Sequence, residues 1–400
     1  MTPSTPPEAS GPLRILQVTS TPNGGSWFHD QVVGLARRGH QVRAVLPAEG
    51  ALSARLRTAD VPVEIVPLNG WRPRQLPRVA AAELRLIRLI REFRPHVVHA
   101  HLLKANIACR VARLAVARGL HVNQVTGINH LRSPILRRID LATLSRADVL
   151  IGSCTAFADR YRRFGARSVA VSHYGCNVRR LDPTASGRPF RAEFGLGDDV
   201  PTIGMVAHMY PTRLRAFRDI GVKGHEVLID AVPRVLARVP GAHVFIVGDE
   251  FVGAGDYRRE LEARVVRLGV AGRVHFTGHR TDVQNVLAAM DVLVNPSMEE
   301  SACYAMIEAL LMEKGAVASD VGGLPDTVQH GETGLLVPPG DPVALAEALV
   351  TLLADPERRR EMGRLGRQRC LRRFDIDRTV ADVESVYRTA LAAAGTGSSW

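Results

Sequence analysis

The sequence predicts an α/β protein made of two Rossmann-like, doubly wound parallel-sheet domains that face each other across a cleft. Short apolar runs alternate with amphipathic stretches along most of the chain, a pattern typical of parallel strands covered by helices. The alternation lapses over residues 186–200, where Pro, Gly and charged residues gather as they do in linkers. A chain of 400 residues is also too long for one compact core and suits two domains.

The first domain is predicted over residues 13–185. Its strands are recognised as apolar runs bounded by turn residues, and its helices by the helical spacing of apolar positions. The predicted strands are 13–20, 41–47, 61–68, 96–102, 121–127 and 147–154, with helices at 28–40 and 78–94.

The second domain is predicted over residues 201–374, and a final helix over 375–395 is expected to pack back on the first domain. The predicted strands are 201–207, 242–249, 273–279, 291–297, 315–321 and 333–340. The helices between and after them are predicted at 224–239, 256–268, 282–290, 302–312, 342–354 and 355–373. Doubly wound sheets bind ligands at the carboxyl ends of their strands, so a ligand is expected in the cleft.

Composition excludes several classes of protein. No apolar run reaches the length of about 18 residues that a membrane-spanning helix needs. Residues 1–12 are rich in Pro, Ser and Thr, lack the basic start and apolar run of a secretory signal, and are expected to form a disordered leader. The five cysteines lie far apart without a CxxC pair, which argues against a zinc site or a disulfide framework and for the cytoplasm.

The net charge of +12 is unevenly distributed. Residues 1–190 carry 28 Lys and Arg against 11 Asp and Glu, a net of +17, whereas residues 191–400 carry 24 against 29, a net of −5. This asymmetry indicates two domains with different partners. A basic first half attracts nucleic acid, anionic lipid or a phosphorylated acceptor, although an arginine-rich solvated surface gives the same composition.

Several nucleotide and hydrolase motifs are missing. No G-x-G-x-x-G follows the first predicted strand, so the fingerprint of a nicotinamide dehydrogenase is absent. The chain also lacks G-x4-G-K-[ST], the phosphate loop of ATP hydrolases, and G-x-S-x-G, the nucleophile turn of serine hydrolases.

The remaining segment with clear chemistry is residues 295–342. A predicted strand ends at its start, the following loop carries Glu300, and a helix expected to begin near Ala302 carries Glu308. The free amide groups and positive dipole of a helix start attract an anionic group such as a diphosphate. Carboxylates on either side of that turn can accept hydrogen bonds from sugar hydroxyls.

This segment resembles the donor-binding segment of retaining glycosyltransferases of family 4 (glycosyl transferases group 1), which have the GT-B fold. The E-x7-E signature of that family maps onto Glu300 and Glu308, and the Gly-rich GGLPDTVQHGETGLLVPPGDP that follows is also typical of it. Further matching stretches are Lys223-Gly224, 246–250, 276–283, 24–42 and 97–105.

The resemblance implies a role for each matched residue. Glu308 would bind the nucleotide ribose, Glu300 the transferred sugar and Lys223 the diphosphate. Gly24 and Gly25 would allow the backbone to approach the diphosphate closely, because glycine has no side chain. Each residue also has a purely structural interpretation, such as a solvated lysine before a helix or a simple strand-to-helix turn.

The resemblance also implies a pocket for the base and a turn around the sugar. Arg280 lies in the stretch that holds the base in relatives. The Gly-Phe-Gly that usually follows the first glutamate is replaced here, which keeps the backbone donors but narrows the pocket. The residues of this turn expected to contact the donor are Ser301, Ala302, Cys303 and Tyr304.

The sequence departs from the family at the second phosphate ligand. Relatives carry an arginine in a G-R-L sequence, whereas this chain has His208 there and an insertion before the lysine. We expect His208 to line the donor site. The insertion supplies cations that could replace the missing one, namely Arg213, Arg215 and Arg218.

Three histidines lie near predicted strand ends of the first domain. The stretch 124–134 resembles a loop that carries an active-site histidine in relatives, so His130 is expected to touch the donor sugar, with a structural hydrogen bond as the alternative. His99 and His101 share one face of a strand, and at least one of them is expected to pack in the core.

The expected reaction is transfer of a sugar, with retained configuration, from a nucleoside-diphosphate donor to an acceptor hydroxyl. UDP is the expected carrier, and the donor is a co-substrate, so no cofactor is expected. Lys223 and helix amide groups would stabilise the leaving diphosphate without a metal. The glutamates are expected to bind rather than to act as acid and nucleophile. The alternatives are a sugar-nucleotide 2-epimerase of the same fold and a non-catalytic protein that binds sugar nucleotides or glycans.

The acceptor is the least defined part of this hypothesis. The basic first domain fits a lipid-linked saccharide of envelope polysaccharide or glycolipid synthesis, with the protein in the cytoplasm and peripheral at the inner membrane face. A small specialised metabolite is the other candidate, and no nucleic-acid partner is expected. The residues leave open the donor base and sugar, the linkage formed and the oligomeric state.

Overall fold

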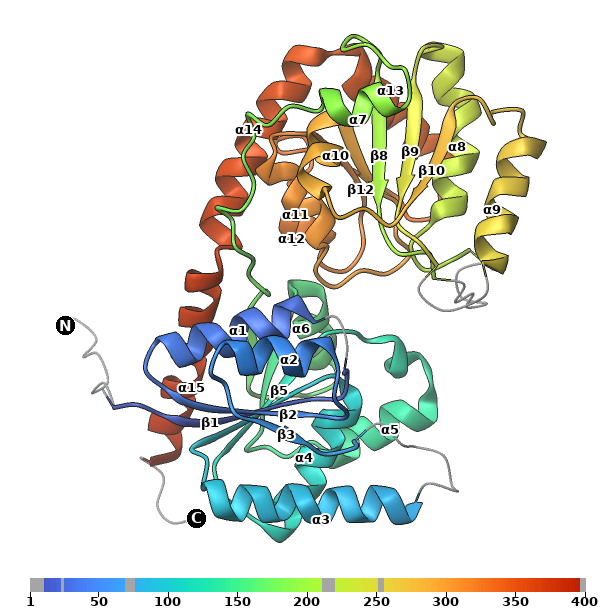
Figure 1. The fold of residues 1–400 in the computed structure, drawn as a ribbon. Helices are drawn as coiled ribbons and strands as arrows, with labels where there is room; N and C mark the ends of the chain where they lie inside the picture. Colours follow the sequence, from blue (N-terminus) through green and yellow to red (C-terminus); the bar gives the residue numbers. More distant parts are fainter. Residues whose placement is uncertain (1–10, 23–24, 69–75, 211–219, 251–254, 396–400) are drawn as a thin grey trace, which may run out of the picture. The chain divides into compact units, whose positions relative to one another are not determined.

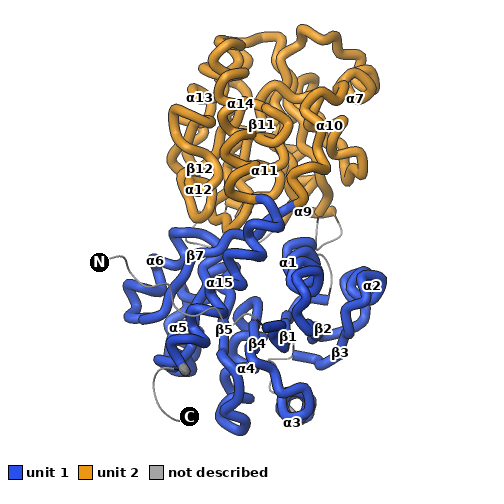
Figure 2. Tube along the Cα trace, turned by 90° about the vertical axis from the view of Figure 1, so that its left-hand side faces the viewer, with its two compact units in different colours: residues 1–176, 375–400 blue, residues 177–374 orange. Residues whose placement is uncertain are grey.

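A computed structural model describes residues 11–22, 25–68, 76–210, 220–250 and 255–395 (Figure 1). The chain divides into two compact units, of which unit 1 combines residues 1–176 with 375–400 and unit 2 comprises residues 177–374 (Figure 2). Each unit contains one parallel sheet covered by helices. The predicted α/β class with two doubly wound sheets is therefore confirmed. The predicted leader at 1–12 lies almost entirely outside the described residues.

The sheet of unit 1 has seven parallel strands in the order β3-β2-β1-β4-β5-β6-β7. Six of them coincide with predicted apolar runs, and β7 is a short edge strand that the sequence analysis did not identify. The bounds are Arg14–Thr19 for β1, Gln41–Leu46 for β2, Val63–Ile65 for β3, Val97–His101 for β4, Leu120–Val125 for β5, Val149–Gly152 for β6 and Val169–Val171 for β7.

Helices cover both faces of this sheet because neighbouring strand residues point to opposite sides. Ile15 packs with α1, α2 and α15, whereas Leu16 and Val18 pack with α3 and α4 on the other face. The helices are α1 (Ser26–Arg37), α2 (Ala51–Thr58), α3 (Leu76–Phe93), α4 (Leu103–Ala115), a 3₁₀ turn (Asn129–Arg132), α5 (Pro134–Thr143), α6 (Thr155–Arg163) and α15 (Ile376–Gly395).

The last helix, α15, is part of the core of unit 1. Val380 and Val383 are buried in the same cluster as strand residues of the sheet. Tyr387 is fully buried, accepts a hydrogen bond from Gln17 Nε2 at 3.0 Å and lies 2.5 Å from His99 Nδ1. Residues 375–395 therefore complete the first unit rather than the second.

The sheet of unit 2 has six parallel strands in the order β10-β9-β8-β11-β12-β13. The bounds are Thr202–Val206 for β8, His243–Val247 for β9, Val274–Gly278 for β10, Val292–Asn295 for β11, Gly315–Ser319 for β12 and Leu335–Val337 for β13. The helices are α7 (Arg188–Glu193), α8 (His225–Arg238), α9 (Asp256–Arg267), α10 (Val283–Ala289), α11 (Tyr304–Leu311), α12 (Leu324–Thr327), α13 (Pro342–Ala354) and α14 (Pro356–Arg373).

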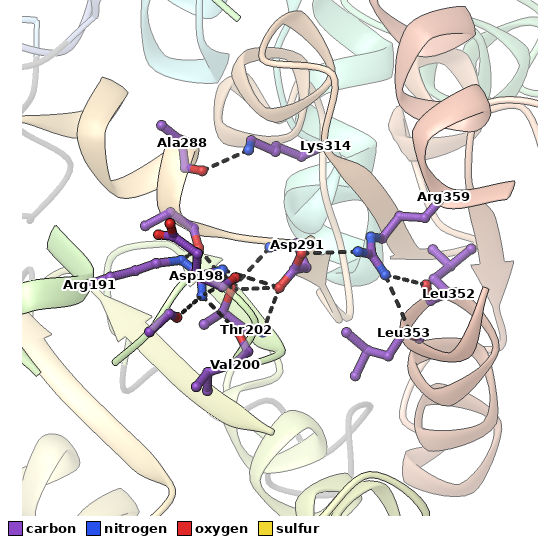
Figure 3. A network of polar contacts seen from close by, with 12 residues as sticks. Arg191, Asp198, Val200, Thr202, Ala288, Asp291, Lys314, Leu352, Leu353 and Arg359 are labelled. Carbon is purple, nitrogen blue, oxygen red and sulfur yellow. Dashed lines mark hydrogen bonds and ion pairs between the residues drawn. The ribbon is translucent and has the colours of Figure 1, made fainter. Parts of the chain in front are cut away.

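The segment predicted as a linker, residues 186–200, is instead an integral part of unit 2. It forms α7, whose Phe190 is buried against Phe245 of β9. Arg191 donates hydrogen bonds to backbone carbonyls and to Thr202, and it pairs with Asp291 (Figure 3). The boundary between the units therefore falls at Cys176 rather than at residue 185.

Within the described residues, no helix combines the length and the apolar character needed to cross a lipid bilayer.

Candidate functional site

The best-placed site in unit 2 lies where the strand order reverses. From β8 the chain continues outward through β9 and β10, and from β11 it continues in the opposite direction through β12 and β13. The loops that leave β8 and β11 therefore diverge at the carboxyl ends of two neighbouring strands. Doubly wound sheets bind their ligands at such a switch point.

An ion pair joins these two loops. Lys223 Nζ lies 2.5 Å from Glu300 Oε2, with Lys223 in the loop after β8 and Glu300 in the loop after β11. The Glu300 side chain is 8% exposed and that of Lys223 is 21% exposed. The structure thus brings together the residue expected to bind the diphosphate, Lys223, and the residue expected to bind the transferred sugar, Glu300.

Close packing between the two loops explains the Lys-Gly pair. Gly224 has a φ of 70°, and a side-chain carbon there would lie 2.0 Å from the carbonyl oxygen of Pro296. Only glycine can adopt this conformation at this separation. The amide of Met298 also donates to the carbonyl of Val222 at 2.9 Å, which fixes Lys223 beside the second loop.

A second glycine pair supports Glu300 from the other side. The amide of Gly323 donates to the Glu300 carbonyl at 3.1 Å. Gly322 has a φ of 55°, and a side-chain carbon there would lie 1.8 Å from the same carbonyl oxygen. The two glycines of the motif GGLPD therefore leave room for the Glu300 backbone and hold it in place.

Electrostatics keeps Lys223 charged. Burial by itself would lower the pKa of Lys223, but the Glu300 carboxylate, together with Cys303 and Tyr210, outweighs burial, so the pKa of the ammonium group is raised. Glu300 also accepts hydrogen bonds from Ser297 Oγ at 3.4 Å and from the amide of Ser301 at 3.2 Å. Lys223 and Glu300 thus place a cation and an anion side by side. A ligand that offers an anionic group to Lys223 and hydrogen-bond donors to Glu300 can replace the ion pair.

Glu308, the second glutamate of the signature, has its own cation. Arg180 Nη2 donates to Glu308 Oε1 at 2.6 Å, with side-chain exposures of 63% for Arg180 and 16% for Glu308. Burial raises the pKa of Glu308, and Arg180 offsets this effect only in part. Arg180 precedes the predicted linker, and nothing in its sequence context indicated this contact.

Helix α11 begins at Tyr304, two residues later than predicted. Ser301 and Ala302 belong to the turn, and Cys303 is the capping residue. Its sulfur accepts hydrogen bonds from the amide of Met306 at 3.4 Å and from Asn295 Nδ2 at 2.7 Å, and its pKa is raised to about 12, first by burial. The Cys303 side chain is therefore a structural cap rather than a donor contact, and contact of Ser301, Ala302 and Tyr304 with a donor stays a prediction.

His208 lies on the extension of β8 at the same sheet edge. The amides of its neighbours Ala207 and Met209 donate to the carbonyls of Val247, the last residue of β9, and of Asp249 at 3.0 Å each. Tyr210, which the sequence analysis did not single out, lies close enough to Lys223 and Glu300 to interact with both charges, and burial raises its pKa. The proposed replacements Arg213, Arg215 and Arg218 lie outside the described residues.

Arg280 is held by acidic neighbours. Its guanidinium contacts Glu193 at 2.8 and 2.9 Å and Asp282 at 2.8 and 2.7 Å. It also lies 5.3 Å from the centre of the Phe190 ring. These contacts connect the stretch around Arg280, which is expected to hold the nucleotide base, to α7. A role for Arg280 in donor binding stays a prediction.

In unit 1 the corresponding switch point lies between β1 and β4. Gly25 follows β1 and starts α1 with a φ of 67°, a conformation that favours glycine. Gly24 lies outside the described residues. His101 ends β4, but its ring is fully buried and contacts Gln17 Oε1 at 2.7 Å and Tyr174 at 3.0 Å, and His99 is buried as well.

His130 belongs to a network in unit 1. Its Nε2 lies 3.1 Å from Asp140 Oδ2 and 3.0 Å from the hydroxyl of Tyr161, which itself donates to Asp140 at 2.5 Å. Burial would raise the pKa of Asp140, but His130, Arg110 and Tyr161 lower it below its usual value. The structural hydrogen bond considered for His130 is therefore present, and contact with a donor stays a prediction.

Two cavities in unit 1 lie away from the strand ends where a ligand is expected. One of about 340 Å³ is lined by residues 117–121, and one of about 660 Å³ by residues 40–43. Both lie at the amino ends of strands, opposite to the end where doubly wound sheets bind ligands.

Comparison with protein families gives two matches. Residues 209–355 match a model described as glycosyl transferases group 1, and residues 25–175 match a glycosyl transferase 4-like domain. Together the two matches cover about three quarters of the chain. They include Lys223, Glu300 and Glu308 in one range and Gly25 and His130 in the other.

Similar sequences carry related names. A D-inositol 3-phosphate glycosyltransferase of Streptomyces bingchenggensis is 32% identical over 253 residues, which cover 61% of this chain and 53% of that protein. A 2-deoxystreptamine N-acetyl-D-glucosaminyltransferase of Streptomyces fradiae is 29% identical over 342 residues, which cover 78% and 75%. The chain thus spans about half the length of the first of these relatives.

A solved structure shows the same fold. HepE of Anabaena, crystallised in complex with UDP, superposes with a TM-score of 0.81 at 22% identity, covering 94% of this chain and 100% of that one. At this identity the likeness extends to the arrangement of strands and helices.

Proposed function

This chain belongs to the group 1 glycosyltransferases of family 4, which have the GT-B fold, and we propose that it transfers a sugar from a nucleoside diphosphate to an acceptor hydroxyl. The observation that carries this proposal is the ion pair of Lys223 and Glu300 at the switch point of unit 2. A nucleotide sugar offers an anion for the lysine and hydroxyl groups for the glutamate. Each residue can therefore give up its contact with the other and bind the donor instead.

UDP is the proposed carrier. HepE of Anabaena has been crystallised with UDP and with UDP-glucose, and its fold is that of this chain. Glu308 would accept hydrogen bonds from the ribose hydroxyls, for which it must leave Arg180. Because Arg180 is largely exposed, it can swing into solvent at little cost.

The chemical step develops negative charge on the leaving diphosphate. We assign its stabilisation to Lys223 and to the backbone amides of the turn before Tyr304, which are fixed before the donor arrives. Glu300 orients the sugar through its hydroxyls and forms no covalent bond to it. The acceptor oxygen bonds to the anomeric carbon on the face from which the diphosphate departs, and the departing phosphate accepts the acceptor proton. Attack on that face retains the configuration without a protein nucleophile. With the charge met by these groups, we propose transfer without a metal ion or other cofactor.

The acceptor is proposed to be anionic. The names of relatives of similar identity include an inositol phosphate and 2-deoxystreptamine, so family membership does not fix the acceptor. The excess of basic residues in the first half of this chain favours a phosphorylated acceptor, either a lipid-linked saccharide of the cell envelope or a small phosphorylated metabolite.

The test is a binding screen with UDP-, GDP- and other nucleotide sugars, followed by acceptor trials with the tightest donor. The expected result is tight binding of one UDP-sugar and a glycoside product whose anomeric configuration, read by NMR, equals that of the donor. Conversion of the donor sugar to its 2-epimer in the absence of an acceptor would identify an epimerase. Donor binding without turnover across the panel would identify a non-catalytic binding protein, and either result would overturn the proposal.

A further inference from the structure

Exposed aliphatic side chains gather on three helices of unit 1. Among the described residues, nine large hydrophobic side chains are exposed, and five of them lie on α3, α4 and α5. Their exposed fractions are 65% for Leu84, 40% for Val111, 84% for Leu114, 71% for Ile135 and 37% for Ile139. Single exposed apolar residues need no explanation, but a gathering on neighbouring helices marks an interaction surface.

The three helices pack on the same face of the sheet. In α3 and α4, buried residues pack with Val98 and Ala100 of β4. Ala100 pairs in register with Asn123, which pairs with Leu150, so these three side chains point to one side. Helix α5 packs against Leu150, and is therefore on that side too. Figure 1 shows α3 and α4 on the side of this sheet opposite to α1 and α2.

Contacts between the helices join them into one surface. A buried ion pair of 2.8 Å connects Arg110 of α4 to Asp140 of α5. Arg91 of α3 donates to the carbonyl of Ala115 at the end of α4 at 3.4 Å. We call the outward side of α3, α4 and α5, with the five aliphatic residues given above, the three-helix face.

Arginines accompany the aliphatic residues at helical spacing. On α3, Leu84, Arg88 and Arg91 are exposed and separated by four and three positions, so they share one stripe. On α5, Arg138 is exposed between Ile135 and Ile139. Each stripe thus combines an apolar side chain with a guanidinium group.

The charge of this region is strongly one-sided. Residues 76–147 contain 13 Lys and Arg but only three acidic residues, Glu83, Glu92 and Asp140. Asp140 is buried in its ion pair, and Glu83 is partly buried, with a pKa that burial raises to about 7. Glu92 is the acidic residue exposed to solvent in this range.

This combination selects among partners. A symmetric contact of this face with the same face of a second copy would bring arginines against arginines, which disfavours self-association through it. Nucleic acid would satisfy the arginines but offers no hydrocarbon for the aliphatic tips. An anionic bilayer provides both phosphate groups and acyl chains at the depth that such side chains reach.

We propose that the three-helix face docks unit 1 on the surface of an anionic lipid bilayer. Leu84, Leu114 and Ile135 enter the boundary of the acyl chains, while Arg88 and Arg138 contact the lipid phosphates. This contact does not depend on the donor chemistry, so it can succeed or fail independently of the proposed sugar transfer.

The test is co-sedimentation of the full chain with vesicles of neutral phosphatidylcholine, alone or mixed with anionic phosphatidylglycerol. We expect binding to the mixed vesicles, weakened by salt. The double variant Leu114→Ser, Ile135→Ser should bind at least about tenfold more weakly, because each change removes a side chain from hydrocarbon. The double variant Arg88→Gln, Arg138→Gln should lose the preference for anionic vesicles.

A matched control keeps the test decisive. The double variant Val266→Ser, Leu268→Ser removes two exposed aliphatic residues of unit 2 outside the three-helix face and should bind like the unmodified chain. Thermal unfolding of all variants checks that they fold. Unchanged binding of the Leu114 and Ile135 variant overturns the proposal. Three other results would also overturn it: equal binding to neutral vesicles, equally strong binding to DNA, or a dimer that the unmodified chain forms and the Leu114 and Ile135 variant does not.

Discussion

The two ends of β11 carry the same kinds of charged residue but in different surroundings. At the amino end, Asp291 accepts hydrogen bonds from the Thr202 amide at 2.9 Å and hydroxyl at 3.0 Å, and it pairs with Arg191 and Arg359 at 3.3 and 3.1 Å (Figure 3). Both arginines are themselves fixed by backbone carbonyls, for example that of Leu352 for Arg359. Every partner in this network is anchored.

At the carboxyl end of the same strand, each carboxylate depends on one side-chain cation. Glu300 has Lys223, and Glu308 has Arg180. Within the described part of the chain, the Arg180 guanidinium has no further hydrogen-bond partner, and it is mostly exposed. Charged groups anchored on all sides stabilise a fold, whereas carboxylates with a single replaceable cation are available to a ligand. Three substitutions test this distinction.

The largest effect is expected from Lys223→Ala. The variant should lower kcat/KM for sugar transfer by about 100- to 1,000-fold, as loss of a donor to a developing anion does in other active sites. The urea midpoint should move little, because Ser297 and the amide of Ser301 still contact Glu300. The matched control is Lys314→Ala, whose ammonium donates to the Ala288 carbonyl at 2.7 Å at the other strand end. Equal loss of activity in both variants would contradict the comparison.

Asp291→Ala should reverse this pattern. The substitution leaves Arg191, Arg359 and the Thr202 amide without their shared acceptor, which should lower the free energy of unfolding by about 2–3 kcal/mol. Transfer by the folded fraction should be unchanged. Urea unfolding, combined with activity per folded molecule, measures both quantities, and lost activity at unchanged stability would argue against a structural role.

A smaller effect is expected from Glu308→Gln. The variant should bind UDP about tenfold more weakly, because a neutral amide is a poorer acceptor for ribose hydroxyls than a carboxylate. Since burial raises the pKa of Glu308, the unmodified chain should lose affinity as the pH falls through that raised value, whereas the variant should not. Calorimetric titration with UDP across the acidic range measures this difference.

The same pKa shift has the opposite sign for stability. A carboxyl whose pKa is higher in the folded than in the unfolded state favours folding at low pH, and this contribution is lost as the pH rises through the raised value. Lowering the pH should therefore increase the contribution of Glu308 to the stability of the unliganded chain and decrease the affinity of the chain for UDP. A parallel response of both would indicate that another group controls binding.

The strands were predictable because parallel strands are apolar throughout, and all six predicted strands of unit 2 are present. Helices α2, α4, α5 and α6 were not predicted. Helix α4 buries the polar residues Asn106 and Arg110 on its inward side, and α6 has only nine residues, so neither carries a long apolar stripe in the sequence. Helix α7 was missed because Pro and Gly around it indicate a turn, while Phe190 and Arg191 fix it through tertiary contacts.

The candidate site was predictable in part. The Lys223 and Glu300 contact follows from the strand order, since each loop leaves one of two neighbouring strands. The contact of Glu308 with Arg180, 128 positions away, depends on tertiary folding that no local pattern encodes. Tyr210 was missed for a similar reason, because its proximity to the charged pair comes from loop packing.

The first unit is closed by the last helix of the chain, and this fixes an order of events during synthesis. Tyr387 seals the interior around Gln17 and His99, yet it leaves the ribosome after every residue of unit 2. The amino-terminal half must therefore wait, incompletely packed, while the later half is made and can already fold. Chains truncated before α15 should expose the apolar side of α1, and nascent chains should depend on chaperones until α15 has been synthesised.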